Sequence, residues 1–160
     1  MPGLELSVSA TTRDPRPGET DGVDYHFLSP AEFERRLEAD EFMEHATYSG
    51  HRYGTLLSEV EPRLEQGIGV LLEIEVQGAR QVRKRMPEAV LVFVAPPTPE
   101  ALRERLERRG TDSPEQIARR LEVASGELEA QREFKHVIVN DDVNRAASEL
   151  ADLVRSELAR

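Results

Sequence analysis

The sequence predicts an α/β domain built on a parallel sheet, and two observations support this prediction. Residues 70–76 (VLLEIEV) and 90–94 (VLVFV) are almost continuously apolar, which is typical of parallel strands buried on both faces. Each run is followed by a segment with helical signals, and strands that alternate with helices indicate an α/β fold. The chain has 160 residues, 38% of them hydrophobic, which suits one folded domain with a real core.

The other strands are expected to be short. Alternating apolar and polar side chains, or brief apolar runs between turn residues, predict strands at 4–10, 23–28, 41–48, 51–53 and 136–139. The segment 11–22 holds two prolines and two glycines and is expected to be an irregular loop. The strands at 41–48 and 51–53 are expected to pair antiparallel around the Ser49-Gly50 turn.

The helices are predicted from their capping signals. Capping boxes begin at Ser29, Ser58 and Ser113, and Thr98-Pro99 starts a further helix. Glycines at 67 and 110 are expected to end two of the helices. The expected helices span 30–39 with Phe33 and Leu37 inward, 58–66, a short segment after Gly78, 99–109, 114–132 and a last stretch from about Val143.

Charge and missing residue types exclude several kinds of site. The formal net charge of -10 disfavours nucleic acid or an anionic membrane as partner, because both attract a basic surface. There is no cysteine, and the four histidines lack a spacing that puts two ligands on one face, so we expect no protein-ligated metal. The sequence shows no secretory signal and no apolar run long enough for a membrane span. The expected location is the cytoplasm.

Arg13 and Arg16 stand three residues apart in the loop after the first predicted strand, where α/β sheets usually present ligands. Two guanidinium forks suit a phosphate dianion, because each donates paired charge-assisted hydrogen bonds. The alternative is that both arginines pair on the surface with Asp14, Glu19 or Asp21. Both interpretations remain open at this point.

Three more residues can be interpreted either as ligand-binding or as structural. Tyr25 and Tyr53 can donate phenolic hydroxyls to the same phosphate, or they are half-buried packing residues. Glu44 lies in the partly apolar strand EFMEHATY, where an inward carboxylate needs donors to offset its desolvation. Guanine offers such a pair in its N1–H and its exocyclic amino group, whereas adenine N1 is an acceptor. The structural alternative is an exposed strand glutamate.

Arg105 and Arg109 lie four residues apart and share one face of the helix after Pro99. Like charges at this spacing repel each other unless an anion lies between them. Arg120, in the next helix, can close over the same anion. The alternative is that residues 103–110 (RERLERRG) form a solvated helix surface.

Five segments in this order closely resemble the guanylate kinase family, enzymes that phosphorylate GMP at the expense of ATP. They are SVSATTRDPRPGETDGVDYHF at 7–27, EFMEHATYSGHRYGT at 41–55, LLEIEVQGA at 71–79, ERLERRGTDS at 104–113 and VIVNDD at 137–142. The resemblance implies a P-loop kinase-type parallel sheet with flanking helices. Within one domain over 1–160 it implies a GMP-binding subdomain at 11–68 and a core at 69–160, with a lid at about 106–121.

The resemblance also implies roles for individual residues. The GMP phosphate is held at the positions of Arg13, Arg16, Tyr25 and Tyr53, and the guanine base at those of Ser9, Glu44, Thr55 and Glu75. The lid positions of Arg105, Arg109 and Arg120 bring charge to the transferring phosphoryl group, and Asn140 lies near the adenine of ATP. Mg²⁺ is the expected cofactor, bound with ATP.

The sequence departs from the family's pattern at two places. Glu75 stands where the family usually has aspartate, and its extra methylene extends the carboxylate by about 1.5 Å. The family also has a strand, a GxxGxGK[ST] phosphate-binding loop (P-loop) and a helix before the segment at 7–27, whereas six residues precede Ser7. The protein is therefore expected to begin roughly 25 to 35 residues upstream, the size of such a unit, and residues 1–160 alone are expected to bind GMP without turnover.

Two further interpretations fit the same features. A non-catalytic guanylate-kinase-like module would bind phosphorylated peptides or GMP through the phosphate site, and the absent loop favours it. A truncated fragment would bind GMP feebly or fail to fold alone. Glu44 and the lid arginines count against the binding module, because recognition of a phosphopeptide needs neither.

Overall fold

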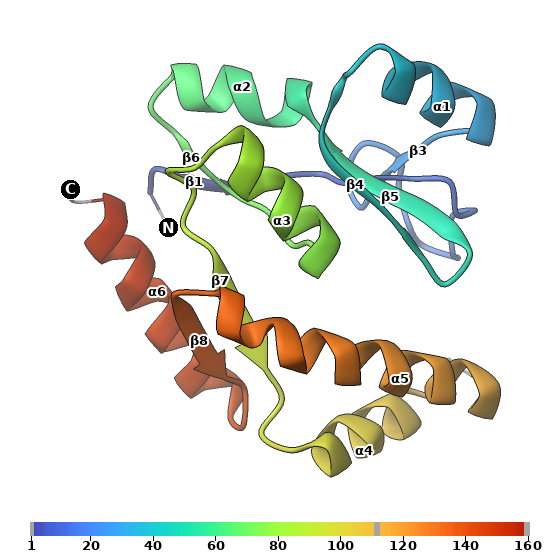
Figure 1. The fold of residues 1–160 in the computed structure, drawn as a ribbon. Coiled ribbons are helices and arrows are strands. Elements are labelled where there is room, and N and C mark those ends of the chain that lie inside the picture. Colours follow the sequence, from blue (N-terminus) through green and yellow to red (C-terminus); the bar gives the residue numbers. More distant parts are fainter. Residues whose placement is uncertain (1, 111–112, 159–160) are drawn as a thin grey trace. The chain divides into compact units, whose positions relative to one another are not determined.

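The computed structural model describes residues 2–110 and 113–158 (Figure 1). The chain divides into two compact units, Met1–Ala89 and Val90–Arg160. Strands alternate with helices in both units, and each unit contains a parallel strand pair. The predicted α/β class is therefore confirmed.

A mixed four-stranded sheet dominates the first unit, with the strand order β3-β2-β5-β4. Its members are β2 (Ala10–Thr11), β3 (His26–Phe27), β4 (Phe42–Tyr48) and β5 (His51–Leu56). The predicted hairpin around Ser49-Gly50 is confirmed: both turn residues have positive φ angles, 52° and 84°, as a type I′ turn requires.

A second, two-stranded parallel sheet joins β1 (Leu4–Leu6) to β6 (Gly69–Leu71). The strand predicted over 4–10 is therefore two strands in different sheets. The break comes at Val8, whose backbone N–H donates to the Glu59 carboxylate at 3.2 Å instead of to a neighbouring strand. The partner in this contact lies 51 residues further along the chain, so the alternating pattern could not reveal the break.

Three helices complete the first unit: α1 (Pro30–Glu38), α2 (Leu57–Glu65) and α3 (Val76–Arg85). Ser29 caps α1 as predicted, its hydroxyl accepting from the Glu32 N–H at 3.1 Å. The capping box predicted at Ser58 is wrong, because α2 begins directly after β5 with Leu56 at the N-cap. The strand pairing runs into this helix, since the Leu57 N–H donates to the Glu41 carbonyl at 2.9 Å.

The start of α3 also differs from the prediction. The strand predicted over 70–76 ends at Leu71, and the helix begins at Val76 rather than after Gly78. Glu75 is its N-cap, with Oε1 accepting from the Gly78 N–H at 2.6 Å. A glutamate rarely caps a helix, so the sequence carried little signal for this boundary.

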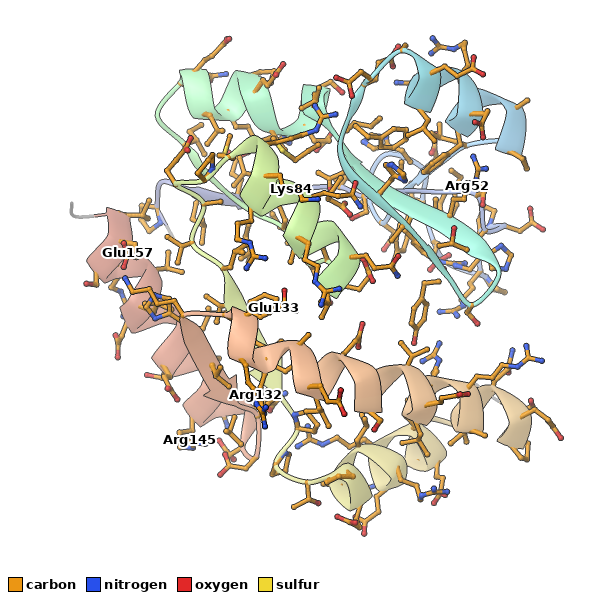
Figure 2. The ribbon with its side chains drawn as sticks, in the orientation of Figure 1. Arg52, Lys84, Arg132, Glu133, Arg145 and Glu157 are labelled. Atoms are coloured by element: carbon orange, nitrogen blue, oxygen red, sulfur yellow. The ribbon has the colours of Figure 1, made fainter. Side chains whose placement is uncertain are left out.

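The core of the first unit lies beneath α1 and between α2, α3 and β4. Phe33 of α1 is fully buried and stacks on Phe42 of β4, with 4.5 Å between ring centroids. Leu37 packs against the same cluster, as predicted for the inner face of α1. Arg52, labelled in Figure 2, covers this core from β5: its guanidinium lies 5.7 Å from the Phe33 ring centroid and pairs with Glu34.

The second unit follows the predicted elements closely. β7 (Val92–Ala95) and β8 (His136–Val139) pair in parallel. α4 (Pro99–Arg109) contacts α5 (Pro114–Ala130), the short 3-10 helix η1 (Gln131–Glu133) follows, and α6 (Val143–Leu158) contacts β8 (Figure 1). The predicted helix starts at Thr98 and Ser113 are confirmed, and the latter forms a full capping box with Gln116.

The predicted lid at about 106–121 is only partly described, because residues 111–112 lie outside the described residues.

Over the part of the chain that the structure describes, no helix is both long and apolar enough to cross a membrane.

Candidate functional site

Glu44 is a buried carboxylate in the middle of β4. It is 4% exposed, so its interpretation as an exposed strand glutamate is wrong. Thr55 lies opposite it in β5, is itself fully buried, and donates its hydroxyl to Glu44 Oε1 at 2.7 Å. Two of the four residues predicted to hold a guanine base are therefore in direct contact.

The second oxygen of Glu44 lies against Gly78 in the first turn of α3. A Cβ atom at position 78 would stand 2.3 Å from Glu44 Oε2 and 3.0 Å from its Cδ, so glycine leaves the space that the carboxylate occupies. The prediction of site residues missed Gly78. The local signal was weak: a glycine inside a helix indicates close packing, but the sequence predicts this helix only after Gly78.

Gln81 fixes α3 against β4 one turn further along the helix. Its Oε1 accepts from the His45 N–H at 3.1 Å, and its Nε2 donates to the His45 carbonyl at 2.6 Å. The side-chain amide thereby pairs with the backbone of β4, the edge strand of the four-stranded sheet, as a neighbouring strand would. Gln81 was likewise not predicted as a site residue, because nothing in the local sequence distinguishes it from other helix glutamines.

Two carboxylates converge at the beginning of α3. Burial raises the pKa of Glu44, and the negative charge of Glu75 adds to the rise, while the hydrogen bonds from Thr55 oppose it. Glu75 uses one oxygen to cap the helix, and the partial positive charge of a helix N-terminus favours such an anion. The site thus offers hydrogen-bond acceptors to a ligand that carries neighbouring donors.

Arg13 and the two candidate tyrosines form a second cluster in the same unit. The Arg13 guanidinium lies 5.3 Å from the ring centroid of Tyr25 and 5.8 Å from that of Phe27. The rings of Tyr25 and Tyr53 meet edge to face at 6.3 Å. The pKa of Arg13 is raised mainly by its hydrogen bond to Glu19, and Tyr53 contributes to the rise. Three of the four predicted phosphate residues are therefore neighbours.

Arg13 also forms one of the ion pairs that the sequence left open. Its Nη2 lies 2.8 Å from Glu19 Oε1. Arg16 is exposed, and its backbone N–H donates to Glu19 Oε2 at 2.7 Å. Ser9 is half-buried between β1 and β2, with its carbonyl accepting from the His26 N–H at 2.9 Å. Their roles toward a ligand stay predictions.

The second unit contains the remaining candidates. Arg105 is exposed on α4, and its Nη2 donates to the carbonyl of Asn140 at 2.8 Å. The Asn140 N–H in turn donates to the Ala95 carbonyl at the end of β7, also at 2.8 Å. Arg120 is half-buried on α5. Arg109 is the last residue of α4, and its side chain lies outside the described part of the chain.

Comparison with known proteins identifies relatives across nearly the whole chain. The guanylate kinase family model matches residues 3–157. The guanylate kinase of Frankia casuarinae is 58% identical over 153 residues, which are 96% of this chain and 83% of that protein. The guanylate kinase of Symbiobacterium thermophilum is 51% identical over 159 residues, 99% of this chain and 75% of that protein.

A solved structure agrees with these matches. The crystal structure of guanylate kinase from Anaplasma phagocytophilum superimposes with a TM-score of 0.85 at 33% sequence identity. The superposition covers 99% of this chain and 78% of that one.

Proposed function

The chain belongs to the guanylate kinase family, and we propose that it transfers the terminal phosphoryl group of ATP to the phosphate of GMP. The observation that supports this acceptor is the buried Glu44, held by Thr55 and seated against Gly78. A protein keeps an ionisable carboxylate out of water only where a partner compensates for its desolvation. Among the described residues, Thr55 is the hydrogen-bond partner of Glu44, through its hydroxyl and its backbone, and a ligand with two adjacent donors would complete the set.

Guanine is the purine that supplies those donors. Its N1–H and exocyclic amino group point in the same direction and match the two oxygens of a carboxylate. Adenine presents the lone pair of N1 at the corresponding place and would be repelled by Glu44. A site built around hydrogen-bond acceptors rejects an analogue that lacks the donors, because its buried polar groups are then left unpaired. Ser9 and Glu75 join Thr55 and Glu44 in this proposed base site.

The arginines and tyrosines are proposed to hold phosphates. Arg13, Arg16, Tyr25 and Tyr53 bind the phosphate of GMP, and Arg105, Arg109 and Arg120 neutralise the transferring phosphoryl group. Phosphoryl transfer depends mainly on positioning and charge stabilisation, so arginine is the expected residue at these places. Asn140 is proposed to lie near the adenine of ATP, where its backbone N–H is already engaged with Ala95.

Magnesium enters this proposal with the nucleotide. Among residues 2–110 and 113–158, no three His, Asp or Glu side chains are grouped as metal ligands. The charge that Mg²⁺ supplies when bound would act on the phosphates of its ATP complex. The cytoplasm is retained as the proposed location.

A phosphopeptide-binding module is the less favoured alternative. Recognition of a phosphopeptide would use the cluster of Arg13, Tyr25 and Tyr53, but the peptide would offer no guanine to hydrogen-bond with the buried Glu44. Calorimetric titration with GMP, AMP and guanosine separates the two functions. The proposal expects GMP to bind at least about a hundredfold tighter than AMP, since the two bases differ at a pair of charge-assisted hydrogen bonds, and expects guanosine to bind measurably.

Equal affinities for GMP and AMP would contradict the choice of acceptor. Phosphoryl transfer itself is measured as GMP-dependent ADP formation by the protein with MgATP. The same assay with AMP as acceptor serves as the control, and comparable rates for the two acceptors would contradict the proposal.

A further inference from the structure

Glu19 occupies a defined place at the end of a tight turn. The turn runs from Arg16 through Pro17 and Gly18 to Glu19, whose N–H donates to the Arg16 carbonyl at 3.0 Å. Gly18 has a φ angle of 91°, and proline followed by glycine at positive φ is the signature of a type II turn. The turn brings the Glu19 carboxylate back toward Arg13 and Arg16.

The carboxylate of Glu19 accepts three hydrogen bonds there. Arg13 Nη2 donates to Oε1 at 2.8 Å and Nη1 to Oε2 at 3.0 Å, while the Arg16 N–H donates to Oε2 at 2.7 Å. The side chains of Arg13 and Glu19 are 12% and 19% exposed, so this pair is largely shielded from solvent. These bonds lower the pKa of Glu19, the Arg13 bond most strongly, and the carboxylate is ionised at neutral pH.

The hydrogen bonds of Arg13 to Glu19 and to the Asp14 carbonyl leave one edge of its guanidinium for other partners. A guanidinium has five N–H donors in a planar fork. Glu19 takes two of them, and the Asp14 carbonyl takes the other Nη1 donor at 2.7 Å. The Nε–H and the second Nη2–H lie together on the remaining edge, a second pair suited to two oxygens of one anion. Tyr53 also hydrogen-bonds to Arg13, and as another predicted phosphate residue it would bind the same anion beside this edge. The aromatic rings of Tyr25 and Phe27 fix the plane of the fork.

We propose that Glu19 is a positioning residue for the phosphate of GMP, acting through Arg13: it holds one edge of the guanidinium so that the opposite edge faces the phosphate. The inference rests on the proposed function. The opposite reading makes Glu19 a competitor that occupies Arg13 until phosphate displaces it. The geometry favours positioning, because Glu19 and the phosphate would use different edges of the fork and both can bind at once.

Glu19→Gln tests this role at constant side-chain size, and Glu19→Asp keeps the charge while shortening the reach. Glu38→Gln is the matched control, because Glu38 is an exposed glutamate on α1 and the charge change is the same. The affinities of all four proteins for GMP and for guanosine are measured by calorimetry. Guanosine lacks the phosphate and reports on the base site alone.

We expect both Glu19 variants to bind GMP about tenfold more weakly, the loss of one hydrogen bond between charged groups, and to bind guanosine as the wild type does. Glu38→Gln should match the wild type with both ligands.

Unchanged or tighter GMP binding by Glu19→Gln would overturn the inference, and tighter binding would identify Glu19 as a competitor. A parallel loss of guanosine and GMP binding would also overturn it, because it would show a general structural role for the loop. A wild-type protein that binds guanosine and GMP equally, or neither, would contradict the proposed function itself.

Discussion

Thr55 and Glu44 are joined by a 2.7 Å hydrogen bond between two buried side chains in adjacent strands. Thr55→Val keeps the shape of the side chain and removes the donor. The carboxylate then loses a hydrogen bond to a charged group, so we expect the free energy of unfolding to fall by about 1.5 to 3 kcal/mol at neutral pH. Urea denaturation measures the change.

The matched control for this substitution is Thr47→Val. Thr47 lies in β4, the strand that contains Glu44, but is exposed, so the change should stay within about 0.5 kcal/mol. Equal losses in the two variants would show that the threonine hydroxyl at position 55 does not support Glu44.

The contrast between Thr98 and Gly78 shows what could be predicted from the sequence. Thr98-Pro99, Ser113 and the apolar run at 136–139 are local signals, and the structure has helix starts and a strand at those places. Gly78, Gln81 and the break at Val8 depend on residues that lie far away in the sequence. Glu44 lies between these cases: the apolar strand suggested that it could be inward, but only β5 and α3 show how its carboxylate is held.

Gly78→Ala should separate ligand binding from stability. The added methyl would meet Glu44 Oε2 at 2.3 Å, and the atoms in its way are the end of a side chain that can rotate aside. We therefore expect the fold to be kept, with a loss of about 1 to 2 kcal/mol in the free energy of unfolding, while the Glu44 carboxylate moves out of its position. We expect guanosine to bind at least about tenfold more weakly, as measured by calorimetry.

Gly126→Ala is the control, because Gly126 lies inside α5 and a Cβ added there would meet no other atom within 4 Å. This variant should be more stable by up to about 1 kcal/mol through its higher helix propensity and should bind guanosine normally. Normal guanosine binding by Gly78→Ala would show that the contact with Glu44 does not set the base site.

The raised pKa of Glu44 predicts how affinity depends on pH. Guanine needs the ionised carboxylate as acceptor, and protonation replaces one acceptor by a donor. Because burial raises the pKa of Glu44 above its usual value of 4.5, guanosine affinity should fall as the pH drops through this raised value. Guanosine is the ligand of choice here, since it has no phosphate that titrates. An affinity that stays constant from neutral pH down to pH 4.5, the usual pKa of a glutamate, would contradict the prediction.

The same pKa shift predicts an opposite effect on stability. A carboxyl group whose pKa is higher in the folded state binds its proton more tightly there, so folding is favoured at low pH. The contribution of Glu44 to the free energy of unfolding should therefore decrease as the pH rises from the usual glutamate value of 4.5 through the raised pKa. Glu44→Gln cannot titrate, and the difference between its stability and that of the wild type should grow in its favour over this range. A difference that is independent of pH would contradict the assignment.

Gln81→Ala tests whether α3 is held to β4 through the edge of the sheet. The substitution removes both hydrogen bonds to the His45 backbone, and we expect a loss of about 1 to 3 kcal/mol in the free energy of unfolding, the net value of two such bonds. Gln77→Ala, at an exposed position one turn earlier in the same helix, should change stability by less than about 0.5 kcal/mol. Because Gly78 lies between these two positions, a shift of α3 in Gln81→Ala moves the wall against which Glu44 is seated, and guanosine binding should weaken in this variant alone. Equal guanosine affinities in the two variants would show that Glu44 is held in place by β5 without help from the helix.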